Sequence, residues 1–133
     1  MTPLHVDRFV RDGRGPELQF IHWSPNGSAI LAIDYFNPDD VYKPPSLKHV
    51  VFTRAQVVMI TPEEVIDYSA QDPEMSNHRT AGIFDLGRTP WLRSFAPYHL
   101  ERCHHFRLFF YDELVDVVAE SVDCRLGGFN PAG

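Results

Sequence analysis

Apolar residues along the chain fall in short runs that alternate with turn-forming residues, a pattern typical of β-strands. The clearest pair of runs lies within residues 17–36 and flanks the segment Pro25-Asn26-Gly27-Ser28. Asn-Gly favours a type I′ turn because both of its positions need a positive φ. A two-residue loop there predicts a hairpin in which Trp23 lies opposite Ile30. Both faces of this hairpin are largely apolar, so we expect it in the centre of a sheet that is covered on both sides.

A second hairpin is predicted between residues 105–111 and 114–122. A two-residue loop at Asp112 and Glu113 would place one set of apolar side chains on a single face. That set is Phe106, Leu108, Phe110, Val115, Val117 and Ala119. Because the apolar side chains of both strands fall on this one face, the register is the best supported in the chain.

The other face of this hairpin carries opposite charges, because Arg107 and Asp116 become diagonal neighbours. The competing interpretation is a helix over residues 112–122, capped by Asp112. The many valines in this segment favour the strand, since β-branched side chains fit a sheet better than a helix.

Three further strands are predicted from β-branched and apolar runs. Residues 4–10 predict a first strand, and residues 81–86 predict a short strand later in the chain. Residues 48–60 predict either one long strand or two strands joined at a bulge near residues 53–56.

Two segments predict helical turns. Thr61, followed by Pro62 and Glu64, has the spacing of a capping box at the start of a short helix. Residues 90–103 predict helical turns with apolar side chains, and Pro97 excludes one continuous helix there.

These elements together predict a single α+β domain over residues 1–124 and a flexible C-terminal tail over residues 125–133. We expect a curved antiparallel β-sheet or partly open barrel of about five to seven strands, with one or two short helices packed on it. A chain of 133 residues is one ordinary domain and can bury a substantial core. The expected core residues are Phe20, Ile33, Val51, Phe52, Val58, Trp91, Phe95, Phe106, Leu108, Phe110, Val115 and Val117.

The charge balance narrows the choice of partner. Twelve Lys and Arg oppose 18 Asp and Glu, which gives a net charge of −6. We therefore expect no nucleic acid partner, because nucleic acid affinity depends largely on neutralised phosphates. A basic protein fits this balance better.

Location is predicted from what the sequence lacks. No run of about 18 uncharged apolar residues is present, so we expect no membrane span. The residues at the N-terminus do not form the basic and apolar regions of a secretory signal, so the cytoplasm is the expected location. Cys103 and Cys124 are then expected to be thiols.

Motifs for catalysis are missing from the sequence. There is no Gly-x-Ser-x-Gly nucleophile elbow, and Asp12-Gly13-Arg14-Gly15-Pro16 lacks the Lys-Ser/Thr pair of a phosphate-binding loop. Cys103 adjoins His104, but adjacency in sequence does not place a base against a thiol. We predict a protein that is not an enzyme, with no catalytic residues and no cofactor.

A small metal-binding or hydrolytic domain centred on His99, Cys103 and His105 is the first alternative. On a helix, His99 and Cys103 would share a face, as two metal ligands should. Cys124 or Glu120 could supply a further ligand. The spacing differs from the two closely spaced ligand pairs of common structural zinc sites.

An aromatic and acidic patch on the more polar face of the second hairpin is the predicted binding site for another protein. Exposed aromatic side chains beside acidic ones suit such a surface. The predicted protein-binding residues are Phe109, Tyr111, Asp112, Glu113, Asp116 and Glu120.

Short stretches from residue 48 onward resemble segments of small, acidic bacterial immunity proteins. They are His49-Val50-Val51-Phe52, the pair Trp91-Leu92, and two closing strands, His105-Phe106-Arg107-Leu108 and Val117-Val118-Ala119-Glu120. The resemblance contains no diagnostic motif and transfers no functional residue. It implies a non-catalytic protein that binds and blocks a toxin, here a basic one.

The second alternative is a structural or oligomerisation subunit. Such a subunit would use an uncovered sheet edge or face as a symmetric interface. The sequence leaves open whether the chain is a monomer or a homodimer.

Overall fold

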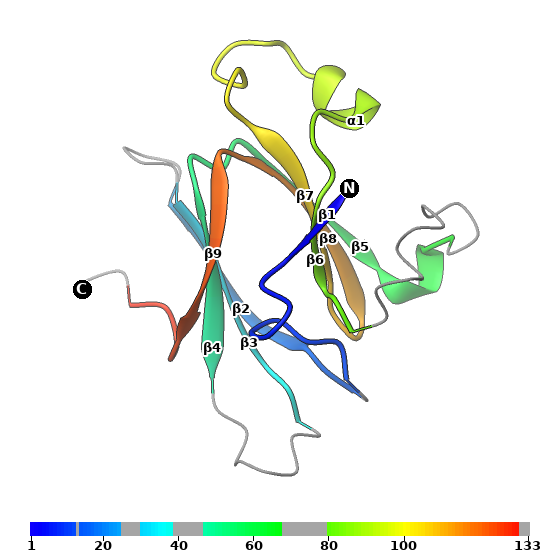
Figure 1. Cartoon of the computed structure of the whole chain (residues 1–133), viewed down its shortest axis with the longest axis vertical. Coiled ribbons are helices and arrows are strands. Elements are labelled where there is room, and N and C mark those ends of the chain that lie inside the picture. Colours follow the sequence, from blue (N-terminus) through cyan, green and yellow to red (C-terminus); the bar gives the residue numbers. More distant parts are fainter. Residues whose placement is uncertain (13, 25–29, 39–46, 68–79, 131–133) are drawn as a thin grey trace.

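Two antiparallel β-sheets pack face to face and form the body of the molecule (Figure 1). The structure, a computed structural model, describes residues 1–12, 14–24, 30–38, 47–67 and 80–130. Within these residues the fold is mainly β, with two sheets that do not close into a barrel, and this corrects the predicted α+β class. The reason is that both predicted helical segments form only a turn or so of helix.

The five-stranded sheet has the order β1-β6-β7-β8-β5. Its strands are β1 (Thr2–Leu4), β6 (Ile83–Asp85), β7 (His104–Phe109), β8 (Glu113–Ala119) and β5 (Val57–Pro62). The four-stranded sheet has the order β2-β3-β4-β9. Its strands are β2 (Glu17–Ser24), β3 (Ile30–Phe36), β4 (Lys48–Thr53) and β9 (Ser121–Leu126).

The helical segments are the 3₁₀ helix η1 (Glu63–Val65) and the single-turn helix α1 (Pro90–Arg93). Neither they nor any other helix in the described ranges has the length and apolar character needed to cross a membrane.

Two stretches of chain, β4–β5 and β8–β9, run side by side between the four-stranded sheet and the five-stranded sheet. β4 pairs with β9 in the four-stranded sheet, and the following strand β5 pairs with β8 in the five-stranded sheet. Thr53 pairs with Ser121 before the crossing and Val57 pairs with Val118 after it, so the β4–β5 side holds one residue more. This extra residue is a β-bulge, and it lies where the sequence predicts a break between two strands.

The β7–β8 hairpin has the predicted faces with a register shifted by two residues. Arg107 lies directly opposite Asp116 instead of diagonally, because the amide of Phe110 donates to the carbonyl of Glu113 and closes the turn one residue early. A shift of two residues leaves every side chain on its face. The strand interpretation of residues 112–122 is confirmed, with a break at the sheet crossing.

The β2–β3 hairpin departs from the prediction in register and in place. Trp23 pairs with Leu31, one residue away from its predicted partner, and a bulge between Leu18 and Phe20 absorbs the difference. The predicted Asn-Gly turn lies outside the described residues. β3 is central and buried, but β2 is an edge strand. The prediction that β2 lies in the centre of the sheet is therefore wrong. An apolar strand at a sheet edge has the same sequence pattern as a strand that is covered on both faces.

The main core fills the space between the two sheets. Eight predicted core residues are buried: Ile33, Val51, Phe52, Phe106, Leu108, Phe110, Val115 and Val117. Val58, Trp91 and Phe95 are half-buried. Phe20 is 65% exposed, which contradicts its predicted place in the core, because it lies on the edge strand.

The predicted capping box at Thr61 does not form. Thr61 belongs to β5, and η1 begins after Pro62 without a side-chain cap. The amide of Glu63 donates instead to the carbonyl of Asp112, 2.8 Å away. Strand pairing with β8 therefore extends through the residues that the sequence assigns to a helix start.

The predicted flexible tail over residues 125–133 begins inside β9, which extends to Leu126, and the segment after this strand covers part of the outer face of the four-stranded sheet. The amide of Phe129 donates to Asp34 Oδ1 at 2.8 Å. The Phe129 ring centroid lies 5.3 Å from that of His22 and 5.6 Å from that of His49. As a result, Asp34 and His49 are buried polar residues.

The predicted first strand over residues 4–10 is wrong, because β1 ends at Leu4 and the amides of Arg8 and Phe9 donate to the carbonyl of His5 in a turn. After this turn Phe9 packs between the sheets. Its ring centroid lies 4.7 Å from that of Tyr35 and 5.3 Å from that of Phe110.

Replacing Gly82 with alanine is expected to lower the free energy of unfolding by about 2 kcal/mol, because the added methyl group would overpack the filled core around Phe9. The new Cβ would lie 2.5 Å from Cδ1 of Phe9. Urea denaturation measures the loss.

Gly127→Ala is the control for this substitution. Gly127 has a φ of +78° and no atom within 4 Å of a new Cβ, so it reports backbone strain alone, about 1 kcal/mol. A Gly82→Ala variant as stable as the parent protein would show that the Phe9 ring moves aside without loss.

Candidate protein-binding surface

The six side chains predicted to bind a partner do not form one surface. Phe109 is buried, with its ring centroid 5.9 Å from that of Phe84 and the guanidinium of Arg11 over its ring at 4.7 Å. Asp116 is fully buried. Neither side chain is available to a partner at the surface, which corrects their predicted role. The sequence does not show that loops cover the outer face of this sheet.

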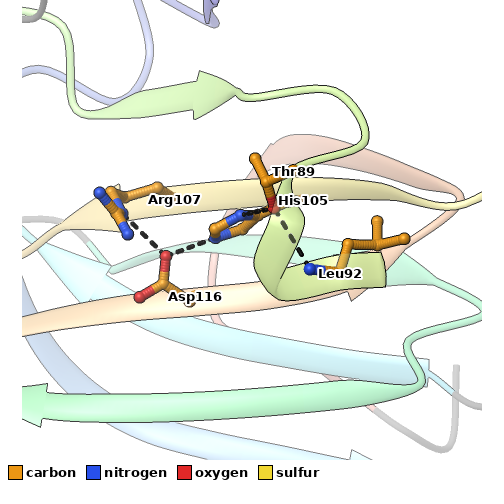
Figure 2. A network of polar contacts seen from close by, with 5 residues as sticks. All are labelled: Thr89, Leu92, His105, Arg107 and Asp116. Carbon is orange, nitrogen blue, oxygen red and sulfur yellow. Dashed lines mark hydrogen bonds and ion pairs between the residues drawn. The ribbon is translucent and has the colours of Figure 1, made fainter. Parts of the chain in front are cut away.

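Asp116 is the centre of a buried polar network on that outer face (Figure 2). Its Oδ1 accepts hydrogen bonds from His105 Nε2 at 2.6 Å and from Arg107 Nε at 2.8 Å. On the other side of the imidazole, Nδ1 lies 2.8 Å from the hydroxyl of Thr89. The oxygen of that hydroxyl also accepts a hydrogen bond from the amide of Leu92, which caps α1. The network therefore ties α1 to the β7–β8 hairpin.

The order hydroxyl, imidazole and carboxylate resembles a catalytic triad, but its imidazole and carboxylate are buried. His105 is 3% exposed, and the ring of Trp91 packs on it with centroids 4.6 Å apart. A reacting group must approach the hydroxyl within hydrogen-bond distance, and the hydroxyl of Thr89 already caps a helix. This geometry fits a structural role for the network, which holds α1 on the sheet.

The residues of the metal alternative direct their ligand atoms elsewhere. Cys103 Sγ is 3.6 Å from the main-chain oxygen of His99, and both ring nitrogens of His105 belong to the polar network. Burial, reinforced by the charge of Glu120, raises the pKa of the Cys103 thiol, which disfavours the thiolate that a metal requires. Cys124 lies in the main core. In the part of the chain that the structure describes, no three His, Cys, Asp or Glu side chains converge on a metal position.

The turn between β7 and β8 meets the start of β2. The amide of Tyr111 donates to the carbonyl of Pro16 at 2.9 Å, and Tyr111 is half-exposed. Partial burial raises the pKa of Glu113, and the charges of Asp112 and Glu17 raise it further. We call Glu17, Asp112 and Glu113 the acidic cluster. A cation placed beside this cluster would relieve the repulsion among its carboxylates.

β2 leads away from the acidic cluster along one edge of the four-stranded sheet. Phe20, Ile21 and Trp23 on this strand are 65%, 38% and 44% exposed. An edge strand presents backbone groups that no neighbouring strand pairs, and aromatic side chains are enriched at protein interfaces. We call β2 together with the acidic cluster the β2 edge surface. The sequence pattern predicts Asp112 and Glu113 as binding residues but not β2, because apolar residues on both faces also fit a strand in the centre of a sheet.

The other long edges differ from β2 in side-chain chemistry. On β9, Arg125 Nε pairs with Asp123 Oδ2 at 3.2 Å, and charged side chains protect an edge from pairing. On β5, Met59 and Ile60 are 42% and 44% exposed and are aliphatic. Among the described edges, β2 therefore offers the largest exposed aromatic area.

Glu120, the last of the predicted binding residues, lies at the opposite end of β8 from the acidic cluster. Its Oε2 pairs with Arg54 Nε at 2.6 Å across the bulge between the sheets. Both residues line a cavity of about 440 Å³, together with His99, Glu101 and Arg102. Arg54 and His99 have positive φ values of 53° and 66°. The charges around this cavity balance, so it favours neither anions nor cations.

The raised pKa of Glu113 gives a testable pH dependence. An acid whose pKa is higher in the folded state contributes less stability once the pH rises through that pKa. Glu113→Gln is therefore expected to stabilise the protein by about 0.5 kcal/mol at pH 7, the scale of like-charge repulsion between neighbouring side chains. The difference should vanish below about pH 4, where the carboxyl is protonated in both folded and unfolded chains.

Urea denaturation at several pH values measures this effect, and Glu101→Gln is the control. Glu101 is an exposed carboxylate outside the acidic cluster. A gain from Glu113→Gln that is the same at pH 4 and pH 7 would contradict the repulsion within the cluster.

Comparisons with known proteins return no similar protein. No family model, no curated protein and no solved structure matches this chain.

Proposed function

We propose that this chain is a non-enzymatic protein-binding module that binds a basic protein through the β2 edge surface. The resemblance to bacterial immunity proteins implies a toxin as that partner. The observation that supports the proposal is one continuous feature of the fold: an exposed aromatic edge strand that begins at a cluster of three carboxylates.

The edge strand indicates how the partner binds. An extended segment can add to an exposed sheet edge through main-chain hydrogen bonds, while alternate side chains give specificity. Phe20 lies on one face of β2, and Ile21 and Trp23 lie on the other. A partner strand with apolar side chains on both faces could therefore contact all three.

The acidic cluster indicates the charge of the partner and the orientation of its strand. Glu17 lies at the first residue of β2, so a bound strand would bring its Lys or Arg residues to that end. The net charge of −6 would add long-range attraction for a basic protein. Affinity should therefore fall as salt rises and the Debye length shortens.

Selection of peptides from a random displayed library tests this proposal. We expect selected peptides to alternate apolar residues and to carry Lys or Arg at one end. Hydrogen exchange of the complex should show new protection of the amides of β2. With Asp112→Asn and Glu113→Gln combined, the preference for a basic end should disappear, while Glu101→Gln, the matched control, should leave it intact.

Two results would overturn the proposal. One is protection confined to β5 or β9, which would place the binding site on another edge. The other is a concentration-dependent dimer in sedimentation whose interface protects β2, which would assign this edge to self-association.

A further inference from the structure

A cavity of about 170 Å³ opens at one end of the space between the two sheets. Its walls come from the turn after β1, the end of β3, the start of β4 and the end of β9. The lining residues are Asp7, Arg8, Tyr35, Lys48, Cys124, Arg125 and Leu126. Three of them are basic and one is acidic, in a protein whose net charge is −6. The cavity therefore has a local charge opposite to that of the whole chain.

Lys48 occupies a position where strand periodicity predicts an apolar side chain. Val50 and Phe52 follow it at the alternate positions of β4, and both are fully buried in the main core. Lys48 pairs with Tyr35 on one side and with Leu126 on the other. The ammonium group thus belongs to the inward face of the four-stranded sheet, at the point where that face opens to solvent.

Arg8 is held in place by main-chain groups. Its Nη1 donates to the carbonyl of Cys124 at 2.9 Å, and the hydroxyl of Tyr35 donates to the carbonyl of Arg8 at 2.9 Å. A hydrogen bond to a neutral carbonyl orients a guanidinium without cancelling its charge. Arg125, in contrast, pairs with Asp123.

The floor and rim of the cavity are chemically different. At the floor, Cys124 and Tyr35 are buried, and burial raises the pKa of the Cys124 thiol to about 11. The thiol therefore stays protonated at neutral pH, which fits a binding cavity better than a nucleophilic one. At the rim, Leu126 is 85% exposed and offers an apolar surface beside the basic groups.

We propose that this cavity binds a small phosphate monoester, with the phosphate between Arg8 and Lys48 and an apolar group on Leu126. Arg matches phosphate oxygens with paired donors, and Lys adds a point charge. The preoriented guanidinium reduces the ordering cost of binding. This site is separate from the β2 edge surface and does not depend on the proposed function.

Calorimetric titration with phenyl phosphate tests the proposal. We expect a dissociation constant below about 1 mM for the parent protein, and weaker binding of inorganic phosphate, which lacks the apolar group. Lys48→Gln should weaken phenyl phosphate binding about tenfold, the usual scale for one charge-assisted hydrogen bond. Arg93→Gln removes an exposed positive charge on α1, so it is the matched control and should bind like the parent protein.

A second variant keeps the test valid if Lys48→Gln fails to fold. Leu126→Glu changes an exposed rim residue and adds a repulsive charge, so it should also weaken binding about tenfold. Ser121→Glu, on the same strand and exposed, adds the same charge away from the cavity and should have no such effect. The proposal is overturned if phenyl phosphate does not bind at up to about 10 mM, or if both cavity variants bind it like their controls.

Discussion

Replacing Asp116 with alanine is expected to lower the free energy of unfolding by about 3 kcal/mol, because it breaks a buried charge network. Asp116 is fully buried and accepts hydrogen bonds from His105 and Arg107. Its removal would break both of these hydrogen bonds at once. Arg107 is partly exposed and can turn toward water, so the loss should lie near the lower end of the range for buried pairs. Urea denaturation measures it.

Asp123→Ala is the control for this loss. Asp123 pairs with Arg125 at the surface, and exposed ion pairs contribute at most about 1 kcal/mol. Thr89→Val should cost about 1 kcal/mol, because it removes the cap of α1. A loss from Asp116→Ala no larger than that from Asp123→Ala would contradict the structural role of the network.

The second large effect concerns binding at the β2 edge surface. Substituting both Phe20 and Trp23 with lysine is expected to weaken the affinity for a selected basic peptide at least a hundredfold, which is about 2.7 kcal/mol. The change removes two aromatic contacts and adds two positive charges that repel the peptide. Both side chains are at least 44% exposed, so the fold should persist. Calorimetry gives the affinity, and circular dichroism checks the fold.

A variant matched in charge separates the two causes. Substituting Val6 and Tyr98 with lysine adds the same charge at positions that are 55% and 77% exposed, outside the β2 edge surface. This variant should lose only the part of the affinity that long-range charge provides, and that part should shrink at high salt. Equal losses in the two variants would mean that Phe20 and Trp23 make no contact with the peptide.

Side-chain faces were predictable from the sequence, and exact partners were not. In the β7–β8 hairpin, alternation places Phe106, Leu108 and Val115 on the core face, as the structure has them. The register depends on where the turn closes, and one main-chain hydrogen bond moved it by two residues. A shift of two residues keeps every side chain on the same face of the sheet. The predicted faces were therefore right, although the predicted residue pairs were not.

The candidate surface was only partly predictable. Asp112 is exposed in the turn, as expected, but Glu113 begins β8 and is half-buried, and Phe109 is buried. Its burial depends on segments distant in sequence, including Arg11 above its ring. The exposure of Phe20 could not be deduced, because an apolar strand has the same pattern at an edge as in a centre. A place in the sheet order is a property of the whole fold.

The paired strands that cross between the sheets have a consequence for folding. β4–β5 and β8–β9 share backbone hydrogen bonds on both sides of the crossing, including one from the amide of Gln56 to Val118 and one from Glu120 to Thr53. Neither sheet can therefore open along this border without disturbing the other. The partners are far apart in sequence, so this border forms only after a large loop closes. We therefore expect the two sheets to fold in a single cooperative event, and a fragment that ends before β8 would lack the strands that complete both sheets.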